Sequence, residues 1–366
     1  MNILVSHPYV WAEVRRGAER HLEDLVGYLC GRGHRVRVLT TANGTPLPPR
    51  PDRAPYVVRG RAASRWLTGR GVDPLAAFVP TMVPPLLRDP ARIVHALSPA
   101  DGAAAVLTRR PGRAVVTTLM GIPFRWWNER TGTGSLMWRT VLGRADAIVC
   151  LSAFSARVLE ADYGRTAHVI PLGVDLERFR SAAPRAADPT ILFAAALDEP
   201  RKRLDLLLSA FAAIAGEHPG LRVVARGNGD PAAALAARDA LPADLRGRVE
   251  IKGAAEGDLA ADYSAAWVTA LPSRNEALGL VLAESLACGT PVVGTADGGI
   301  TDVIDDPAIG RTFAPDDADD LARALAEGLA LAREDGVGER CRASAGRYDM
   351  ATAVGPAIER VYRSVA

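Results

Sequence analysis

The sequence predicts an α/β protein of two domains, each built on a parallel sheet. Its 366 residues are about twice the roughly 150 residues expected of one domain. Short apolar runs alternate with stretches of helical spacing, which is the pattern of βαβ units. The alternation restarts after HVIPLGVDLERF (168–179), so a second domain is expected there, with Gly173 to Arg180 as the candidate linker.

The first domain is expected to begin with a βαβ unit. NILVS (2–6) is an apolar run, residues 17–32 carry apolar side chains at helical spacing, and HRVRVLTT follows as a second strand. Parallel strands need a crossover, usually a helix, so this unit predicts a parallel sheet. Residues 41–90 are rich in Pro, Gly and Arg, which favours loops around a few short elements. Further buried strands are expected at 91–97, 113–119 and 146–152.

The second domain repeats the pattern. A strand at 190–196 precedes a helix at 203–218, and more strands are expected at 221–227, 248–253, 267–273 and 290–295. The last segment, RYDMATAVGPAIERVYRSV, has an apolar stripe that predicts a terminal helix despite Pro356. We expect this helix to pack back on the first domain.

Composition limits the partners and the compartment. Lys and Arg total 44 against 42 Asp and Glu, and this net charge of +2 gives no reason to expect nucleic acid as a partner. The four cysteines lie far apart without CxxC spacing, which favours buried reduced thiols over a metal site. No basic leader and no apolar run of about 18 residues is visible, so a cytoplasmic protein is expected.

Two carboxylates stand out in SRNEALGLVLAESLACGTPVV (273–293). The helix predicted at 278–287 is apolar nearly all round, so it should be buried, and a buried carboxylate at Glu284 needs a partner. The hydroxyls of a bound sugar are such a partner for Glu284 and for Glu276, which lies at the helix start. The alternatives are a first-turn acid that favours the helix dipole at Glu276 and an exposed residue at Glu284.

The start of the same helix suits a phosphate group. Gly279 loosens it, and its first amides have no intrahelical acceptor, so they can bind a diphosphate. WVTALPS leads directly into Glu276, and ligands of α/β folds lie at the carboxyl ends of the strands.

A family resemblance rests on these residues. PSRNEALGLVLAESLACGTPVVGTADGGITDVI (272–304) resembles the signature segment of family-4 retaining glycosyltransferases, whose two glutamates are separated by seven residues. Four further segments agree with the family in order, and with them the match spans nearly the whole chain: GAERHLEDLVGYLCGRGHRV, IVCLSAFSARVL, VIPLGVDLERF and DEPRKRLDLLL.

The resemblance implies the GT-B fold, in which two Rossmann-like domains face each other across a cleft. Residues 1–173 would form the acceptor-side domain, with a C-terminal helix at 346–366 packed on it, and residues 174–345 the nucleotide-sugar-binding domain. A nucleoside-diphosphate sugar would be the co-substrate, with no other cofactor and no metal.

The resemblance also implies roles for single residues. Glu276 would contact the hydroxyls of the donor sugar, Glu284 those of the ribose, and Lys202 the diphosphate. Fixed cations aimed at a leaving diphosphate lower the barrier because negative charge develops there. Donor binding would also involve Arg201, Gly279 and the amides at Leu280 and Val281.

The chain departs from the family pattern at two positions. Ala196 stands where relatives usually carry a diphosphate-binding Arg, and candidates to compensate are Arg201, Arg203, Arg226 and Arg16. Arg16 and Gly17 form the loop expected near the diphosphate or the acceptor. Met120 replaces a His that contributes to the sugar site in the family, so the sugar pocket is expected to be unusual.

Three other features have more than one interpretation. His95 is either a satisfied core histidine or a cleft residue. Phe124, Arg125, Trp126 and Trp127 form an aromatic and basic cluster that fits an acceptor sugar, a membrane surface, or core or interdomain packing. The acidic run APDDADDLARAL (314–325) predicts a helix N-terminus with Asp at the cap, not a metal site.

The predicted function is a retaining glycosyltransferase. It would move a hexose-type sugar from a GDP- or UDP-linked donor to a hydroxyl of a small-molecule, lipid or glycan acceptor. DEPRKR is reminiscent of mannosyltransferases that act on inositol lipids, and a peripheral membrane contact is a further expectation. The alternatives are a nucleotide-sugar epimerase and a degenerate, non-catalytic sugar-nucleotide-binding protein. The sequence does not determine an oligomeric state.

Overall fold

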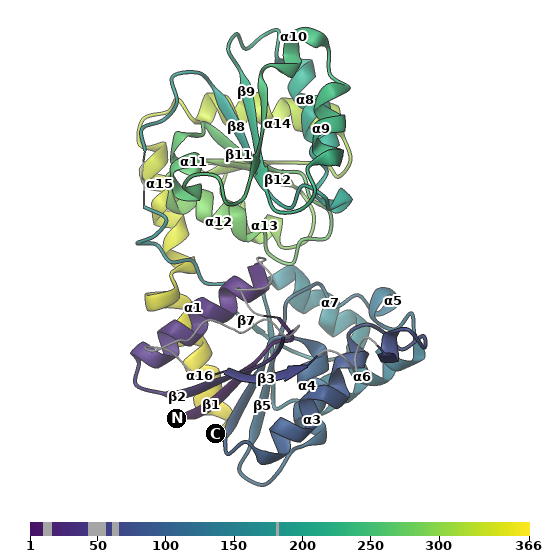
Figure 1. Ribbon diagram of the computed structural model, residues 1–366. Helices are drawn as coiled ribbons and strands as arrows, with labels where there is room; N and C mark the ends of the chain where they lie inside the picture. Colours follow the sequence, from purple (N-terminus) through teal and green to yellow (C-terminus); the bar gives the residue numbers. More distant parts are fainter. Residues whose placement is uncertain (10–16, 43–55, 61–65, 181–182) are drawn as a thin grey trace. The chain divides into compact units, whose positions relative to one another are not determined.

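The computed structural model describes residues 1–9, 17–42, 56–60, 66–180 and 183–366. The chain divides into two compact units: unit 1 contains Met1–Gly173 and Met350–Ala366, and unit 2 contains Val174–Asp349. Each unit is built on its own parallel sheet (Figure 1). The α/β class and the parallel sheets predicted from the sequence are therefore confirmed.

Unit 1 contains a seven-stranded sheet of order β3-β2-β1-β4-β5-β6-β7. Its strands are β1 (Asn2–Ser6), β2 (Arg35–Ala42), β3 (Tyr56–Gly60), β4 (Ile93–Ala96), β5 (Ala114–Leu119), β6 (Ala147–Cys150) and β7 (His168–Val169). Its helices are α1 (Gly17–Gly31), η1 (Ala76–Phe78), α3 (Val79–Arg88), α4 (Pro99–Leu107), α5 (Arg125–Asn128), α6 (Gly132–Arg144), α7 (Ala153–Tyr163), η4 (Met350–Val354) and α16 (Gly355–Val365).

Unit 2 contains a six-stranded sheet of order β10-β9-β8-β11-β12-β13. Its strands are β8 (Thr190–Ala194), β9 (Arg222–Gly227), β10 (Val249–Gly253), β11 (Val268–Leu271), β12 (Val292–Thr295) and β13 (Gly310–Phe313). Its helices are η2 (Pro200–Lys202), α8 (Leu204–Ile214), α9 (Ala232–Asp239), α10 (Ala243–Arg246), α11 (Leu259–Ala265), α12 (Leu280–Ala287), α13 (Ile300–Val303), α14 (Ala318–Leu331), α15 (Val337–Ala345) and η3 (Gly346–Tyr348). Helices cover both faces of the sheet, and α8 packs against α14 while α12 packs against α15 (Figure 1).

The C-terminal helix belongs to the core of unit 1. Ile358, Val361 and Tyr362 of α16 are buried in one apolar cluster with residues of β1 and α1. Pro356 does not interrupt α16 because it lies in the first turn, where a missing amide costs nothing. The preceding five residues, Met350–Val354, form a π-helical turn, so the terminal helix is shorter than the segment quoted for it.

The region 41–90 differs from its expectation of loops around short elements. It contains α3, a ten-residue helix with Pro80 in its first turn and Pro84 and Pro85 inside. Met82, Pro85 and Leu86 of this helix are buried, so tertiary packing outweighs the low helix propensity of proline. Residues 43–55 and 61–65 lie outside the described part of the chain.

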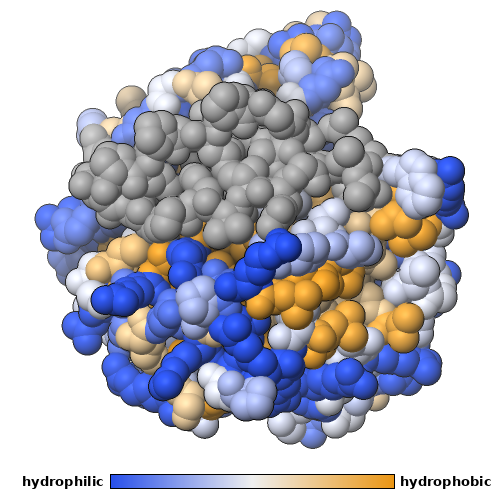
Figure 2. Space-filling view, turned by 60° about the horizontal axis from the view of Figure 1, so that its bottom comes forward, coloured by the Kyte–Doolittle hydropathy of each residue, from blue (hydrophilic) through white to orange (hydrophobic). Residues whose placement is uncertain are grey.

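Arginines gather at the amino-terminal edge of the unit 1 sheet. Arg35 begins β2, Arg92 precedes β4, and Arg88, Arg109 and Arg110 lie where α3 and α4 end; all five are exposed. Figure 2 brings the lower end of Figure 1 forward and shows many hydrophilic residues there, with apolar ones between them. The near-neutral net charge of the chain is therefore compatible with a local group of exposed arginines, of which Arg109 pairs with Asp146. No described helix is both long and apolar enough to cross a membrane.

Candidate functional site

The strand order of unit 2 defines one point at which its chain reverses direction across the sheet. From β8 the chain winds outward to β9 and β10, whereas from β11 it winds the other way to β12 and β13. Because β8 and β11 are parallel neighbours, the loops that follow them lie at the same edge. Open α/β sheets bind ligands at such a switch point, outside the carboxyl ends of the strands.

The loop after β8 brings two cations to this edge. It ends in the short turn Pro200–Lys202. The backbone of Arg203 is left-handed, with φ of 55°, immediately before α8. Arg201 is tied to the loop after β11 in both directions, because its carbonyl accepts from the Arg274 amide at 3.0 Å and its Nη1 donates to the Arg274 carbonyl at 3.1 Å.

Glu276, from the loop after β11, meets both cations. Its Oε1 accepts from Arg201 Nη1 at 3.0 Å and forms an ion pair with Lys202 Nζ. Its side chain is only 13% exposed. Burial alone would raise the pKa of this carboxyl, but the nearby charges of Lys202 and Arg201 outweigh burial and hold the pKa below its ordinary value.

The helix after Glu276 begins with backbone amides that no side chain caps among the described residues. Its N-cap is Gly279, at φ of 88°, and no side chain caps it. The first amides of a helix have no intrahelical acceptor, and here they belong to Leu280 and Val281. These two residues are half-buried, whereas every residue from Leu282 to Ala287 is buried. The helix therefore offers amides and the positive end of its dipole at this edge of the sheet.

Glu284 lies deeper in the same helix. It is 2% exposed, and its Oε2 accepts a hydrogen bond from the Tyr263 hydroxyl at 2.9 Å. The buried helix was expected from the apolar pattern. A buried carboxylate needs a hydrogen-bond partner, and for Glu284 a tyrosine of α11 is one. Tyr263 was missed because nothing in DLAADYSAAW links a lone tyrosine to a carboxylate 21 residues later.

The candidate replacements for the arginine missing at Ala196 have different positions. Arg226 of β9 is 4% exposed and donates to the carbonyls of Ala254 and Gly257 as well as pairing with Asp262, so it supports the loop between β10 and α11. Arg203 pairs with Asp205 and Asp316. Arg201 is the one of these three that contacts Glu276.

The remaining predicted site residues belong to unit 1. Gly17 is exposed and begins α1, and Arg16 lies outside the described residues. Met120 follows β5, is half-buried and packs against the apolar core of its own unit.

His95 is a satisfied core histidine. Its Nδ1 lies 2.7 Å from the Tyr362 hydroxyl and its Nε2 2.7 Å from the Thr118 hydroxyl. The side chain is fully buried, and burial, helped by His21, lowers its pKa to about 3. His95 is therefore neutral at ordinary pH and holds the C-terminal helix to the sheet.

The aromatic and basic cluster around α5 is a surface feature. Trp126 is 68% exposed and Trp127 54% exposed, their rings lie 5.8 Å apart, and Arg130 stacks 4.0 Å over Trp127. Leu136 of α6 is 69% exposed. Core packing, one of the roles considered for this cluster, is therefore wrong for the two tryptophans within unit 1.

The acidic run at 314–325 forms a helix N-terminus, as predicted. Asp317 caps α14 by accepting from the Asp320 amide at 2.9 Å. In the described part of the chain, no group of three or more His, Cys, Asp or Glu side chains could hold a metal ion.

Comparison with known proteins identifies the family. Residues 15–178 match the family described as Glycosyltransferase Family 4, and residues 188–330 match Glycosyl transferases group 1. A D-inositol 3-phosphate glycosyltransferase of Geodermatophilus obscurus is 30% identical over 91% of this chain and 81% of its own length. A phosphatidyl-myo-inositol mannosyltransferase of Mycobacterium tuberculosis is 29% identical over 100% of this chain and 97% of its own.

Solved structures share the fold along the whole chain. A sucrose-phosphate synthase from Thermosynechococcus elongatus superposes with a TM-score of 0.79 at 21% identity, covering 99% of this chain and 98% of that one. The Anabaena protein HepE, solved in complex with UDP, gives 0.78 at 18% identity with both chains fully covered. The fold is thus the GT-B fold of glycosyltransferases. This chain belongs to the family-4 glycosyltransferases.

Proposed function

We propose that the protein transfers a hexose-type sugar from a nucleoside diphosphate to a hydroxyl, with retention of configuration at the anomeric carbon. The observation that carries the proposal is the contact of Lys202 and Arg201 with Glu276 at the switch point of unit 2. Family membership supports the reaction class and the retention. In this proposal unit 2 binds the nucleotide sugar and unit 1 the acceptor, and the cleft expected between the domains stays a prediction.

The cations act on the leaving group. As the anomeric bond breaks, negative charge develops on the departing diphosphate, so donors already aimed at it lower the barrier more than they stabilise the bound donor. Lys202, Arg201 and the amides at Leu280 and Val281 supply these donors. Because they provide positive charge themselves, the proposal requires no metal ion, and transfer should persist in the presence of a chelator.

The two glutamates orient the donor. The pKa of Glu276 is held low by its cations, so the group stays ionised near neutral pH and accepts hydrogen bonds from sugar hydroxyls. Glu284, held by Tyr263, is proposed to accept from the ribose hydroxyls. The acceptor hydroxyl attacks the anomeric carbon on the face that the diphosphate leaves, and its proton passes to the departing phosphate oxygen.

The names of the relatives narrow the substrates. Two relatives are named for inositol 3-phosphate or phosphatidyl-myo-inositol, so we propose an inositol ring, free or in a lipid, as the acceptor. The mannosyltransferase name favours GDP-mannose as donor. Because the HepE structure contains UDP, UDP-sugars are the second class of donor to be assayed.

An assay of nucleoside-diphosphate release tests the proposal. GDP-mannose and UDP-glucose are each supplied with inositol 1-phosphate, inositol 3-phosphate or phosphatidylinositol vesicles, and the anomer of the first product is read by NMR. Transfer with retention supports the proposal. Sugar interconversion without acceptor would instead indicate an epimerase, and binding without turnover a degenerate protein.

Two substitutions locate the reaction. Lys202→Ala should lower kcat about 10²- to 10³-fold, the range seen when one transition-state donor is removed. Glu276→Gln should lower kcat about 10²-fold, because it removes the charged acceptor that orients the donor sugar. Glu339→Gln, at an exposed position of α15, serves as the control and should match the wild type. Wild-type rates in the first two variants would show that the reaction occurs elsewhere.

We also propose a peripheral contact with anionic membranes through the cluster around α5. Exposed tryptophans beside arginines suit the boundary between headgroups and lipid tails. Arg130 stacks on Trp127. Arg125 and Arg139 both pair with Glu129, so the exposed arginines exceed the acid that they share. Each basic residue near an anionic surface contributes about 1 kcal/mol.

Sedimentation with vesicles tests the contact. The protein should bind vesicles containing phosphatidylinositol better than phosphatidylcholine vesicles, and Trp126→Ala with Trp127→Ala should reduce binding about tenfold. Arg92→Ser with Arg110→Ser is the matched control on the other basic face of unit 1. If only this control variant loses binding, the contact is made by the arginine-rich edge and the proposal is wrong.

A further inference from the structure

Three residues with unusual backbone geometry gather at the switch-point edge of unit 2. Among the described residues, the non-glycine residues with positive φ are Arg203, Asn275 and Asp316, at 55°, 54° and 61°. Such residues are uncommon, and they persist where the surroundings fix them. Arg203 directly follows Lys202, and Asn275 directly precedes Glu276. The constrained backbone therefore flanks both proposed catalytic residues.

Asp316 joins the two loops that carry them. Its carboxylate forms an ion pair with Arg203 of the loop after β8. The same carboxylate accepts from Arg274 Nε at 2.7 Å, in the loop after β11, and a second ion pair links Arg274 to its other oxygen. One side chain from a third loop thus bridges the segments of Lys202 and Glu276.

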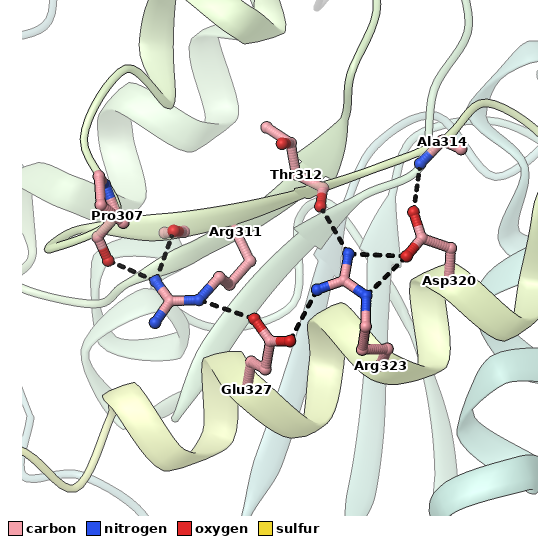
Figure 3. A network of polar contacts seen from close by, with 8 residues as sticks. Pro307, Arg311, Thr312, Ala314, Asp320, Arg323 and Glu327 are labelled. Atoms are coloured by element: carbon pink, nitrogen blue, oxygen red, sulfur yellow. Dashed lines mark hydrogen bonds and ion pairs between the residues drawn. The ribbon is translucent and has the colours of Figure 1, made fainter.

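The Asp316 loop is itself fixed at both ends. Asp320 accepts from the Ala314 amide at 2.7 Å, and Arg323 joins Asp320 to Glu327, at 2.7 Å to each (Figure 3). Glu327 also pairs with Arg311 of β13 at 3.0 Å (Figure 3). These contacts connect the loop to the strand before it and to the helix after it, so the backbone around Asp316 is held in place.

Stability alone does not account for this arrangement. The Asp316 side chain is 30% exposed and that of Arg274 is 52% exposed, and pairs exposed to this extent contribute little to folding. These ion pairs instead fix the relative position of two loops, because the Asp316 carboxylate binds one guanidinium group from each. A misplacement of about 1 Å in a reacting group can cost about 10²-fold in rate.

We propose that Asp316 is a positioning residue: it holds Lys202 and Glu276 in register without contacting the donor. The proposal rests on the proposed function of this site. It predicts that loss of the Asp316 carboxylate slows turnover while leaving the fold and most of the donor affinity intact.

Two variants and one control test the proposal. Asp316→Gly keeps the positive φ accessible and removes the carboxylate, and it should lower kcat about 10- to 100-fold with less than a roughly threefold change in KM for the donor. Asp316→Asn keeps an acceptor for Arg274 and should fall between Gly and the wild type. Asp205→Asn removes the other carboxylate of Arg203 without reaching the Glu276 loop, and it should stay within about twofold of the wild type.

A double-mutant comparison separates positioning from a general structural role. If Asp316 acts through Lys202, then Asp316→Gly should slow the Lys202→Ala variant much less than it slows the wild type. Full additivity, or wild-type kcat in Asp316→Gly, overturns the inference and leaves the proposed function standing. A wild-type protein that transfers no sugar overturns the proposed function, and this inference with it.

Discussion

Glu276 illustrates how charge is arranged at the scale of single residues. Its carboxylate is 13% exposed and pairs with two cations from a neighbouring loop. These ion pairs keep the carboxylate ionised and also fix its orientation. A donor sugar would therefore meet a fixed acceptor whose orientation is already set. Such preorganisation is the main source of electrostatic catalysis in buried sites.

Asp101 provides a residue-scale prediction about pH. It is fully buried at the start of α4, and burial raises its pKa from 3.8 to about 8, although the hydroxyls of Ser98 and Ser6 oppose the shift. The folded state therefore binds more protons than the unfolded state between about pH 4 and pH 8. Stability contributed by this group is present at low pH and is lost as the pH rises through that window.

The variant Asp101→Asn removes this titration. Between about pH 5 and pH 8 the wild type should lose stability relative to the variant, so the difference in free energy of unfolding should move in favour of the neutral amide as the pH rises. Urea unfolding of both proteins at several pH values, followed through the transition in which unit 1 unfolds, measures this difference in free energy. Parallel stability curves for the two proteins would show that Asp101 does not titrate in this range.

Sequence reasoning at this scale found the groups but not their partners. Glu276, Glu284 and Lys202 were singled out from local apolarity and a family motif. Tyr263 and Asp316 were not, because their contacts depend on which loops the sheet brings together. Arg203 and Asp316 are 113 residues apart in the chain, and only the strand order makes them neighbours.

At the scale of elements, α16 depends on a buried carboxylate. Glu359 is 3% exposed and lies 2.8 Å from His34 Nε2 and 2.7 Å from Arg363 Nη2. Burial would raise its pKa, but the hydrogen bond from His34 and the nearby charges of Arg32 and Arg363 outweigh burial and lower it. A depressed pKa contributes stability above the unfolded value, and that stability is lost as the pH falls through the folded value.

Glu359→Gln should therefore destabilise unit 1 by about 1–3 kcal/mol at pH 7, because His34, whose side chain is 13% exposed, loses a charged acceptor. The deficit should shrink as the pH falls below the ordinary carboxyl pKa of 4.5, because the unfolded wild type then binds protons that the folded state takes up only at lower pH. Chemical unfolding at about pH 7 and about pH 3.5 measures both values, with Glu160→Gln, at an exposed position of α7, as the control. An equal deficit at both pH values would contradict the charge-based account.

Elements with strong periodicity were predictable and those held by packing were not. The strands β1, β8 and β11 follow from short apolar runs, and α12 from its apolar residues ahead of Gly289. In contrast, α3 contains three prolines, and local propensity argues against a helix there. Its buried face supplies the stabilisation that the sequence pattern does not reveal.

At the scale of the whole molecule, the chain forms two α/β units, each with a sheet of parallel strands. The last helix belongs to the first unit. That organisation, the resemblance to a family and the match to GT-B structures agree with one another. The family could be recognised because its motif follows a strand and begins a helix, where backbone geometry and ligand chemistry constrain the sequence together. The acceptor has no comparable local motif, and it is proposed here from the names of relatives.

The central claim is that unit 2 binds a nucleoside diphosphate through Lys202, Glu284 and the start of α12. Thermal unfolding with UDP, GDP, TDP and ADP tests it, because a ligand that binds only the folded state raises the apparent stability with the logarithm of its concentration over Kd. Each variant is compared with its own ligand-free melting temperature. We predict a clear rise with UDP or GDP that is lost in Glu284→Ala and reduced in Lys202→Ala. No rise with any of the four, or an equal rise in both variants, would contradict the site.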